Sequence, residues 1–524
     1  MYDAGKLAPA DADFVIAVDD AAGMRRGMVG QGLSAILAAA LDLDRTGESW
    51  KKFAKQLDLS QEEAFDRLLG KRFALVQRWS IKGDSSWAIR SVVDRTTDEF
   101  LRARLKPAPR KMEKGTVVLS IEDGAFWLAL RATGENTAII LGPGTAPGLF
   151  DEMLTASGAG QPDNEHAVTL ADEPYFKDIR ALDGQATGFF FLRLTGLPDG
   201  GEHPRDSGWL ACALRPHDDT LHIGFMARLE AADAPPTERM RWSRRAFDEL
   251  SRDSYFTVMS WATSFDAAQG PLRALKDLVP ALPREIVGEA GRIGGAGGLA
   301  GPRRALVVRQ SAGMLPSPVY AVETVNATKL TAVADRQVGA GLAWVDRMFA
   351  GAATDSKPTV ETGGAKIAEP NDFAGMFPDA VRTADVADHL PPVLAGLVPR
   401  GTVLAWTCRR GGSIVEGEQS GWGVIGIGVK NVEAVTAALT REHRAGVGKE
   451  RKEDAGLPWL SLGVARPSAF VEAIEKQGVP IPPALVQTVE ALHGVEEISW
   501  QALPGGERGV LGFGEVRFVD VKKK

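Results

Sequence analysis

Cys408 is the side chain in this sequence whose surroundings best fit nucleophilic chemistry. It lies between a predicted strand and the run Arg409-Arg410-Gly411-Gly412, and flanking arginines can lower a thiol pKa. His443 is a candidate base, although no spacing in the sequence brings it near Cys408. A small buried residue at a strand end is the more common explanation of such a cysteine. The second cysteine, Cys212, is far away in sequence, so a disulfide framework is excluded and a single bridge is not.

The densest set of potential metal ligands is His217 and His222 with Asp218 and Asp219. The odd separation of the two histidines places their imidazoles on opposite faces of an unbroken strand, and a turn between them would change that. Zinc sites usually have tighter and more recognisable spacing. We therefore expect a polar hairpin tip with one partly buried histidine, and keep a metal or catalytic role as the alternative.

Two further patterns resemble ligand-binding motifs, but the residues or elements around them differ from those that the motifs require. The glycine-rich segment 291–301 fits a loose G-x-G-x-x-A, but a predicted helix precedes it and a strand follows, the reverse of a dinucleotide-binding motif. The segment 42–47 resembles the front of a calcium loop, but Phe53 stands where the bidentate glutamate belongs. Hydrolase and NTPase motifs do not occur either. The sequence thus predicts no catalytic, cofactor-binding or metal-binding residues.

Size and charge narrow the class of protein. The chain has 524 residues, a length typical of about three domains or two large ones. Its net charge of −7 argues against nucleic acid as a main partner. No apolar stretch approaches the roughly 20 residues of a membrane span, and no signal peptide precedes the first predicted strand. A cytoplasmic location is therefore expected, or the periplasm or cell envelope if this is a mature form or starts downstream of the true start.

Short apolar runs separated by turn residues predict strands, most of them joined in hairpins. Hairpins are expected for 72–81 with 87–93, 116–121 with 125–131, 209–214 with 220–229, 402–407 with 423–429, and 498–503 with 510–519. Single strands are expected at 14–18, 137–141, 188–194, 255–261 and 459–464. Ser60 and Glu63 form a capping box at the start of a helix that ends near Gly70, and Asn431 is a candidate cap of a later helix.

The order of predicted elements starts again near residue 251. The segment 70–78 matches 301–309 at six of nine positions without a gap, and a loop and a second strand follow both. We expect a tandem duplication with halves 1–250 and 251–524, and a loose loop or linker at 351–372. Runs of hairpins separated by helices favour an α+β fold, in which each half is an antiparallel sheet with helices packed on one face.

Twelve tryptophans outnumber four tyrosines, and many lie in or beside predicted strands. They are suited to lining a groove for a small apolar ligand, and equally to filling the core of curved sheets. We favour the core. The residues involved are Trp79, Trp87, Trp127, Trp209, Trp406, Trp422 and Trp500.

The opening 9–18, in which Pro9-Ala10-Asp11 leads into a strand, and Leu68-Leu69-Gly70 before a hairpin resemble the uncharacterised bacterial domain-of-unknown-function 3352 family. The resemblance covers about the first hundred residues. It implies no catalytic residues, and because members are mostly exported or envelope-associated, it implies an envelope role.

Together these patterns predict a non-catalytic binding or scaffold protein of unknown ligand, possessing two similar halves. Two alternatives stay open. One is a hydrolase or transferase that uses Cys408 or the His217 and His222 region. The other is a carrier that holds a small apolar ligand in a groove between sheet and helices.

Overall fold

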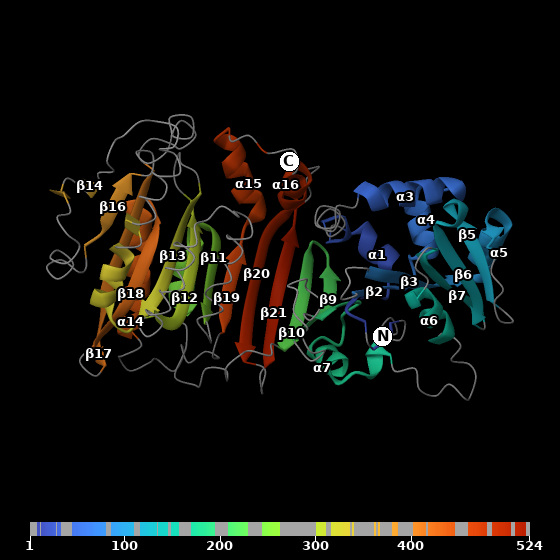
Figure 1. Cartoon of the computed structure of the whole chain (residues 1–524), viewed down its shortest axis with the longest axis horizontal. Coiled ribbons are helices and arrows are strands. Elements are labelled where there is room, and N and C mark those ends of the chain that lie inside the picture. Colours follow the sequence, from blue (N-terminus) through green and yellow to red (C-terminus); the bar gives the residue numbers. More distant parts are fainter. Residues whose placement is uncertain are drawn as a thin grey trace. The chain divides into compact units, whose positions relative to one another are not determined.

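A computed structural model of the chain describes residues 8–10, 12–27, 29–32, 44–79, 85–108, 116–133, 135–144, 148–156, 169–193, 208–228, 244–261, 300–310, 316–335, 338–339, 361–362, 365–366, 380–385, 402–415, 418–445, 460–478, 481, 485–504 and 509–519. The chain divides into two compact units (Figure 1). The first comprises residues 1–231, 481–498 and 505–524, and the second comprises 232–480 and 499–504.

The first unit is built on an antiparallel sheet. In order of neighbours its strands are β4 (Lys106–Pro107), β5 (Thr116–Ile121), β6 (Phe126–Thr133), β7 (Asn136–Pro143), β3 (Ser85–Asp94), β2 (Phe73–Trp79), β1 (Phe14–Val18), β8 (Gly188–Arg193), β9 (Trp209–His217), β10 (Thr220–Arg228) and β21 (Gly509–Phe518). The hairpins β2–β3, β5–β6 and β9–β10 confirm the pairings predicted from turn signals.

Helices cover both faces of this sheet. Against one face pack α3 (Asp44–Gln56), α4 (Gln61–Leu68) and α5 (Arg95–Arg104), which share a buried cluster with Leu128 and Leu130 of β6. Against the other pack α6 (Gly148–Ala156) and α7 (Pro174–Leu182), whose cluster includes Ala129, between those two leucines. Figure 1 shows α3 and α4 on one side of the sheet and α6 on the other.

The expectation of helices on one face is therefore wrong for this unit. Successive residues of a strand point to opposite faces, so two buried clusters that use alternate residues of β6 require two covered faces. The order of elements in the sequence does not determine the side to which each connection returns. Elsewhere in the described part of this unit, α1 (Ala21–Arg26), residues 29–32 and α16 (Val486–His493) are helical, and 3-10 turns lie at Glu122–Gly124 and Leu170–Asp172.

The second unit also contains an antiparallel sheet. Its neighbour order is β16 (Arg382–Asp385), β17 (Val403–Val415), β18 (Glu418–Ile427), β13 (Ser317–Thr324), β12 (Ala300–Arg309), β11 (Ser254–Trp261), β19 (Ser461–Ala465), followed by residues 499–504 of β20 (Val495–Pro504). One face packs on α8 (Arg244–Arg252) and α14 (Val429–Ala445). The other packs on helical residues 327–335, and α15 (Pro467–Lys476) follows β19.

Two local predictions in the second unit are wrong. Gly411 and Gly412 lie between the strands of the predicted hairpin 402–407 with 423–429, where a turn is expected. They form no turn, because β17 continues through them with a register shift between Arg410 and Ile414 and pairs with β18 on both sides of it. Asn431 does not cap α14, which begins two residues earlier at Val429. Its side-chain amide donates to the Ile427 carbonyl instead.

Several predicted segments fall largely outside the described residues. Most of the glycine-rich segment 291–301 does so, and its last two residues begin β12. Of the linker expected at 351–372, the described part is two short antiparallel strands, β14 (Glu361–Thr362) and β15 (Ala365–Lys366). In the described part of the chain, every helix is too short or too polar to cross a membrane.

Candidate functional site

The β9–β10 turn brings the two candidate histidines together. His217 pairs with Thr220 and His222 pairs with Arg215, so both imidazoles lie on one face of the hairpin. Asp218 in the turn has a φ of 49°, in the left-handed region that Asp tolerates better than most residues. The two ring centroids are 6.5 Å apart. The turn thus overrides the opposite-face placement that an unbroken strand would give.

Carboxylates flank this histidine pair. His217 Nδ1 lies 3.4 Å from Asp218 Oδ2, and His222 Nδ1 lies 3.9 Å from Glu515 Oε2 on the neighbouring strand β21. Solvent reaches both rings, and the His217 side chain is 73% exposed. The described residues contain no group of three or more His, Cys, Asp or Glu side chains that could hold a metal ion. Cys212, on the same strand as His217, points to the opposite face of the hairpin.

Cys408 is buried in the second unit. Its side chain is 2% exposed and packs with Ala327 and Leu330. Burial raises the pKa of this thiol to about 11, against the opposing effects of the Thr331 hydroxyl and the Arg382 cation. Burial likewise raises the pKa of Cys212 to about 12. Both cysteines are free, and both are protonated at neutral pH, so neither is an activated nucleophile.

The charged neighbours of Cys408 are Arg382 and Asp335. The Asp335 carboxylate accepts a hydrogen bond from Trp406 Nε1 at 2.7 Å and lies 3.0 Å from Arg382 Nε. The charges that act on Cys408 are thus those of the Arg382–Asp335 ion pair, and not those of Arg409 and Arg410 as the sequence suggested. Sequence reasoning missed this ion pair. No sequence signal marks it, because Arg382 is far from both Asp335 and Cys408 along the chain.

The candidate base His443 belongs to α14, which lies on the other face of the sheet from Cys408. The helix packs on a cluster that includes Ala405 and Val424, whereas Cys408 pairs with Gly423 and lies against Leu330. Alternate residues of β17 point to opposite faces. The proposed cysteine and histidine dyad is therefore not assembled by the fold.

The described tryptophans serve mainly as core residues. Trp422 is fully buried and Trp406 is 3% exposed. Trp127 and Trp209 are partly buried and pack against the core of the first unit. These contacts agree with the interpretation of the tryptophans as core residues. Four of the seven tryptophans named in the sequence analysis pack in the core and do not line a groove.

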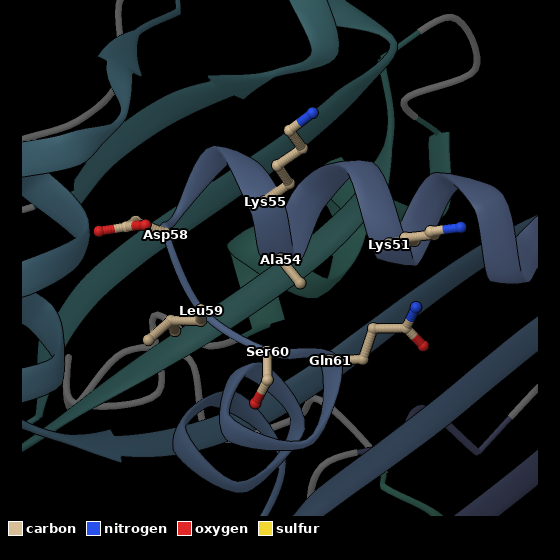
Figure 2. A pocket seen from close by; sticks show the side chains of 7 residues that line it. All are labelled: Lys51, Ala54, Lys55, Asp58, Leu59, Ser60 and Gln61. Atoms are coloured by element: carbon tan, nitrogen blue, oxygen red, sulfur yellow. The ribbon is translucent and has the colours of Figure 1, made fainter.

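A shallow open pocket of about 440 Å³ lies between α3 and α4 (Figure 2). The loop between the helices shapes it. Leu59 N donates to Ala54 O and Asp58 N donates to Lys55 O, which closes α3 with a Schellman motif. Ser60 then opens α4 with the predicted capping box. The pocket is lined by Lys51, Ala54, Lys55, Asp58, Leu59, Ser60 and Gln61.

The chemistry of this pocket is modest. Its walls join small apolar surface to two ammonium groups, and Figure 2 shows the Lys55 ammonium pointing away from α4. The Ser60 hydroxyl accepts from Glu63 N at 3.2 Å, so the helix N-terminus that faces the pocket is already capped by its own side chain. A small polar ligand fits such a surface, and no reacting group of the chain is held there in a constrained geometry.

Comparisons with known proteins give no relative from which a role can be transferred. No protein-family model matches the chain, and neither the curated proteins nor the solved structures contain a match.

Proposed function

We propose that this chain is a non-catalytic binding or scaffold protein made of two related α+β halves, 1–250 and 251–524. The observation that carries the proposal is a repeated strand order. In the first half the neighbours run β5-β6-β7-β3-β2-β1-β8-β9, and in the second they run β16-β17-β18-β13-β12-β11-β19-β20. When these eight strands of each half are numbered by their order along the chain, the two halves have the same sequence of neighbours in the sheet.

The matching segments 70–78 and 301–309 support the same relation at residue level. They coincide with β2 and β12, and one shift in numbering carries both Leu75 onto Leu306 and its partner Ile89 onto Tyr320. Burial follows the same shift, since Ala74 and Val76 correspond to Ala305 and Val307, all of them at most 1% exposed. Two independent sequences would have little reason to share pairing, loop length and burial in this way.

The state of the thiols supports a non-catalytic role. A cysteine nucleophile reacts as the thiolate, and burial keeps both thiols of this chain protonated at neutral pH. The resemblance of 9–18 and 68–70 to the domain-of-unknown-function 3352 family extends the proposal to a place at the cell envelope.

One observation favours a catalytic alternative, namely a hydrolase that uses the hairpin histidines. The rings of His217 and His222 are 6.5 Å apart, and Glu515 Oε2 lies 3.9 Å from His222 Nδ1. General base catalysis needs such an imidazole within reach of a substrate proton.

A turnover screen separates these possibilities. The purified chain is incubated with an activated acetate ester, a thioester and an aryl phosphate, beside Cys408→Ala and the double variant His217→Ala/His222→Ala. We expect all three proteins to leave every substrate at its uncatalysed rate. A turnover that disappears in either variant would overturn the proposal. Native mass spectrometry tests the binding role directly. A small molecule that stays bound in the double variant His217→Ala/His222→Ala would support a binding site that does not use the two histidines.

A further inference from the structure

Two arginines of the first unit converge on one face of its sheet. Arg90 on β3 is opposite Ile140 on β7, and Ile140 is opposite Ala129 on β6. Arg131 stands two residues beyond Ala129, and successive residues alternate between faces, so Arg90 and Arg131 share the face that carries α6. The strand between them presents Ala138 and Ile140, both nearly fully buried. The two cations are therefore separated by apolar surface.

Neither arginine has a counter-charge among the described residues, since no ion pair or hydrogen bond joins either guanidinium to a described carboxylate. The Nε atom of Arg90 is buried and has no hydrogen-bond partner. Arg78, on the same face, differs in this respect, because it pairs with Glu152 of α6 through both terminal nitrogens. Desolvation, followed by the nearby Arg131 cation, lowers the pKa of Arg90.

Such an arrangement disfavours the empty state. Taking a guanidinium out of water is unfavourable unless an anion and hydrogen-bond acceptors replace the solvent, and a like charge nearby adds repulsion. An oxyanion removes both penalties at once, because two arginines can each donate to its oxygens in charge-assisted hydrogen bonds. Apolar surroundings strengthen that attraction relative to water.

We propose that Arg90 and Arg131 form a binding site for an oxyanion, the carboxylate or phosphate group of a small ligand. The inference rests on the proposed binding role and names the chemical class of the ligand. The planar guanidinium groups give the site its preference for oxyanions over halide, since two N–H donors match two oxygens.

The test uses the full chain with inorganic phosphate and octanoate as probes, each compared with sodium chloride at equal ionic strength. Thermal unfolding and calorimetric titration are recorded for wild type, Arg90→Gln and Arg131→Gln. Arg304→Gln is the matched control, because Arg304 is also a strand arginine with a buried Nε that lacks a hydrogen bond, but its Nη1 lies 3.5 Å from the Tyr320 hydroxyl.

We expect phosphate or octanoate to raise the Tm of wild type and of Arg304→Gln in a saturable way. Each site variant should bind the active probe about tenfold or more weakly, the effect of losing one charge-assisted contact. In chloride alone the site variants should unfold no lower than wild type, since they lose a repulsive charge, which excludes misfolding as the cause.

A wild-type Tm that is equal in all three salts would overturn the site, and so would an anion response that survives in both site variants. A response to phosphate alone assigns a phosphate ligand, and a response to octanoate alone assigns a carboxylate with an apolar chain. A negative result overturns the oxyanion site only, because the binding role is tested separately by the turnover screen.

Discussion

The ring of Trp500 lies directly over the α-carbon of Gly463 on the neighbouring strand. A methyl group added at Gly463 would stand 1.9 Å from Trp500 Cζ2, far inside van der Waals contact. The ring cannot move away freely, because Nε1 lies 3.2 Å from Ser461 Oγ and the indole packs at 6.1 Å on Phe256. Glycine is required here by close approach and not by an unusual φ.

Gly463→Ala is therefore expected to lower the free energy of unfolding by about 1–3 kcal/mol, the usual effect of overpacking a formed core. Urea unfolding of the full chain measures it. Trp500→Leu should remove most of the additional cost of Gly463→Ala, so the two substitutions couple in a double-mutant cycle. Additive effects would show that the contact with Trp500 is not the reason why position 463 requires glycine.

Stability should fall in alkaline solution, in part because of Cys408. Its thiol has a pKa of about 11 when folded against a reference value of 9.0. Below pH 9 both states keep the proton and the full stability is present. Between these two values the unfolded chain loses the proton first, which removes up to about 1.4 kcal/mol per pH unit. Urea unfolding at about pH 8 and about pH 10 should show a smaller decline for Cys408→Ala than for wild type. Equal declines would contradict the assignment.

The capping box at the start of α4 should be sensitive to acid. The Ser60 backbone N–H and hydroxyl donate to the Glu63 carboxylate, each at 2.9 Å, and lower the pKa of Glu63 from its reference of 4.5. Ser60→Ala is expected to cost about 1 kcal/mol at neutral pH. The bond from Glu63 N–H to the Ser60 hydroxyl does not depend on pH, whereas the bonds to the Glu63 carboxylate do. Because the pKa of Glu63 is lowered in the folded state, the carboxylate's part of the contribution is present above about pH 4.5 and is lost as pH falls below it. The penalty should thus be smaller at about pH 3, and Ser60→Thr serves as the capping control.

Asp58 occupies the position after α3 where glycine is most favourable. Its φ of 59° lies in the left-handed region, which costs a residue with a Cβ more than it costs glycine. Its carboxylate contributes little, since it is 92% exposed and 3.7 Å from Arg104 Nη1. Asp58→Gly is expected to stabilise the fold by about 0.5–1 kcal/mol, measured by urea unfolding. Asp58→Ala, which keeps a Cβ and lacks the carboxylate, is the control and should give no such gain.

Asp335 is the centre of a partly buried polar cluster. Its carboxylate serves both Trp406 Nε1 and Arg382, and the two charged side chains are about 15% exposed. Asp335→Ala leaves the Arg382 cation without this counter-charge and is expected to cost about 2–4 kcal/mol. Pairing it with Arg382→Met should recover part of the loss, because the orphaned charge is then removed. A loss unchanged in the double variant would show that the Trp406 bond carries the effect.

Local patterns in the sequence were sufficient for most secondary structure. Alternating apolar residues with Asp and Gly turns predicted the hairpins β5–β6 and β9–β10, and Ser60 with Glu63 predicted the start of α4. These features depend on residues close together in the chain, whose geometry is fixed by backbone sterics and nearby hydrogen bonds. The errors at Gly411 and Asn431 arose where partners on β18 or the preceding turn overrode local preference.

The sequence by itself determined the strands, the hairpins, the mixed α and β class, and the absence of a contiguous catalytic motif. Only the tertiary structure decided which residues meet. It placed helices on both faces, brought His222 beside Glu515, separated Cys408 from α14, and set Arg90 near Arg131. These relations depend on the register between strands far apart in the chain and on which face each helix covers. Neither quantity is encoded in a local window of residues, because both are set by the packing of the whole sheet.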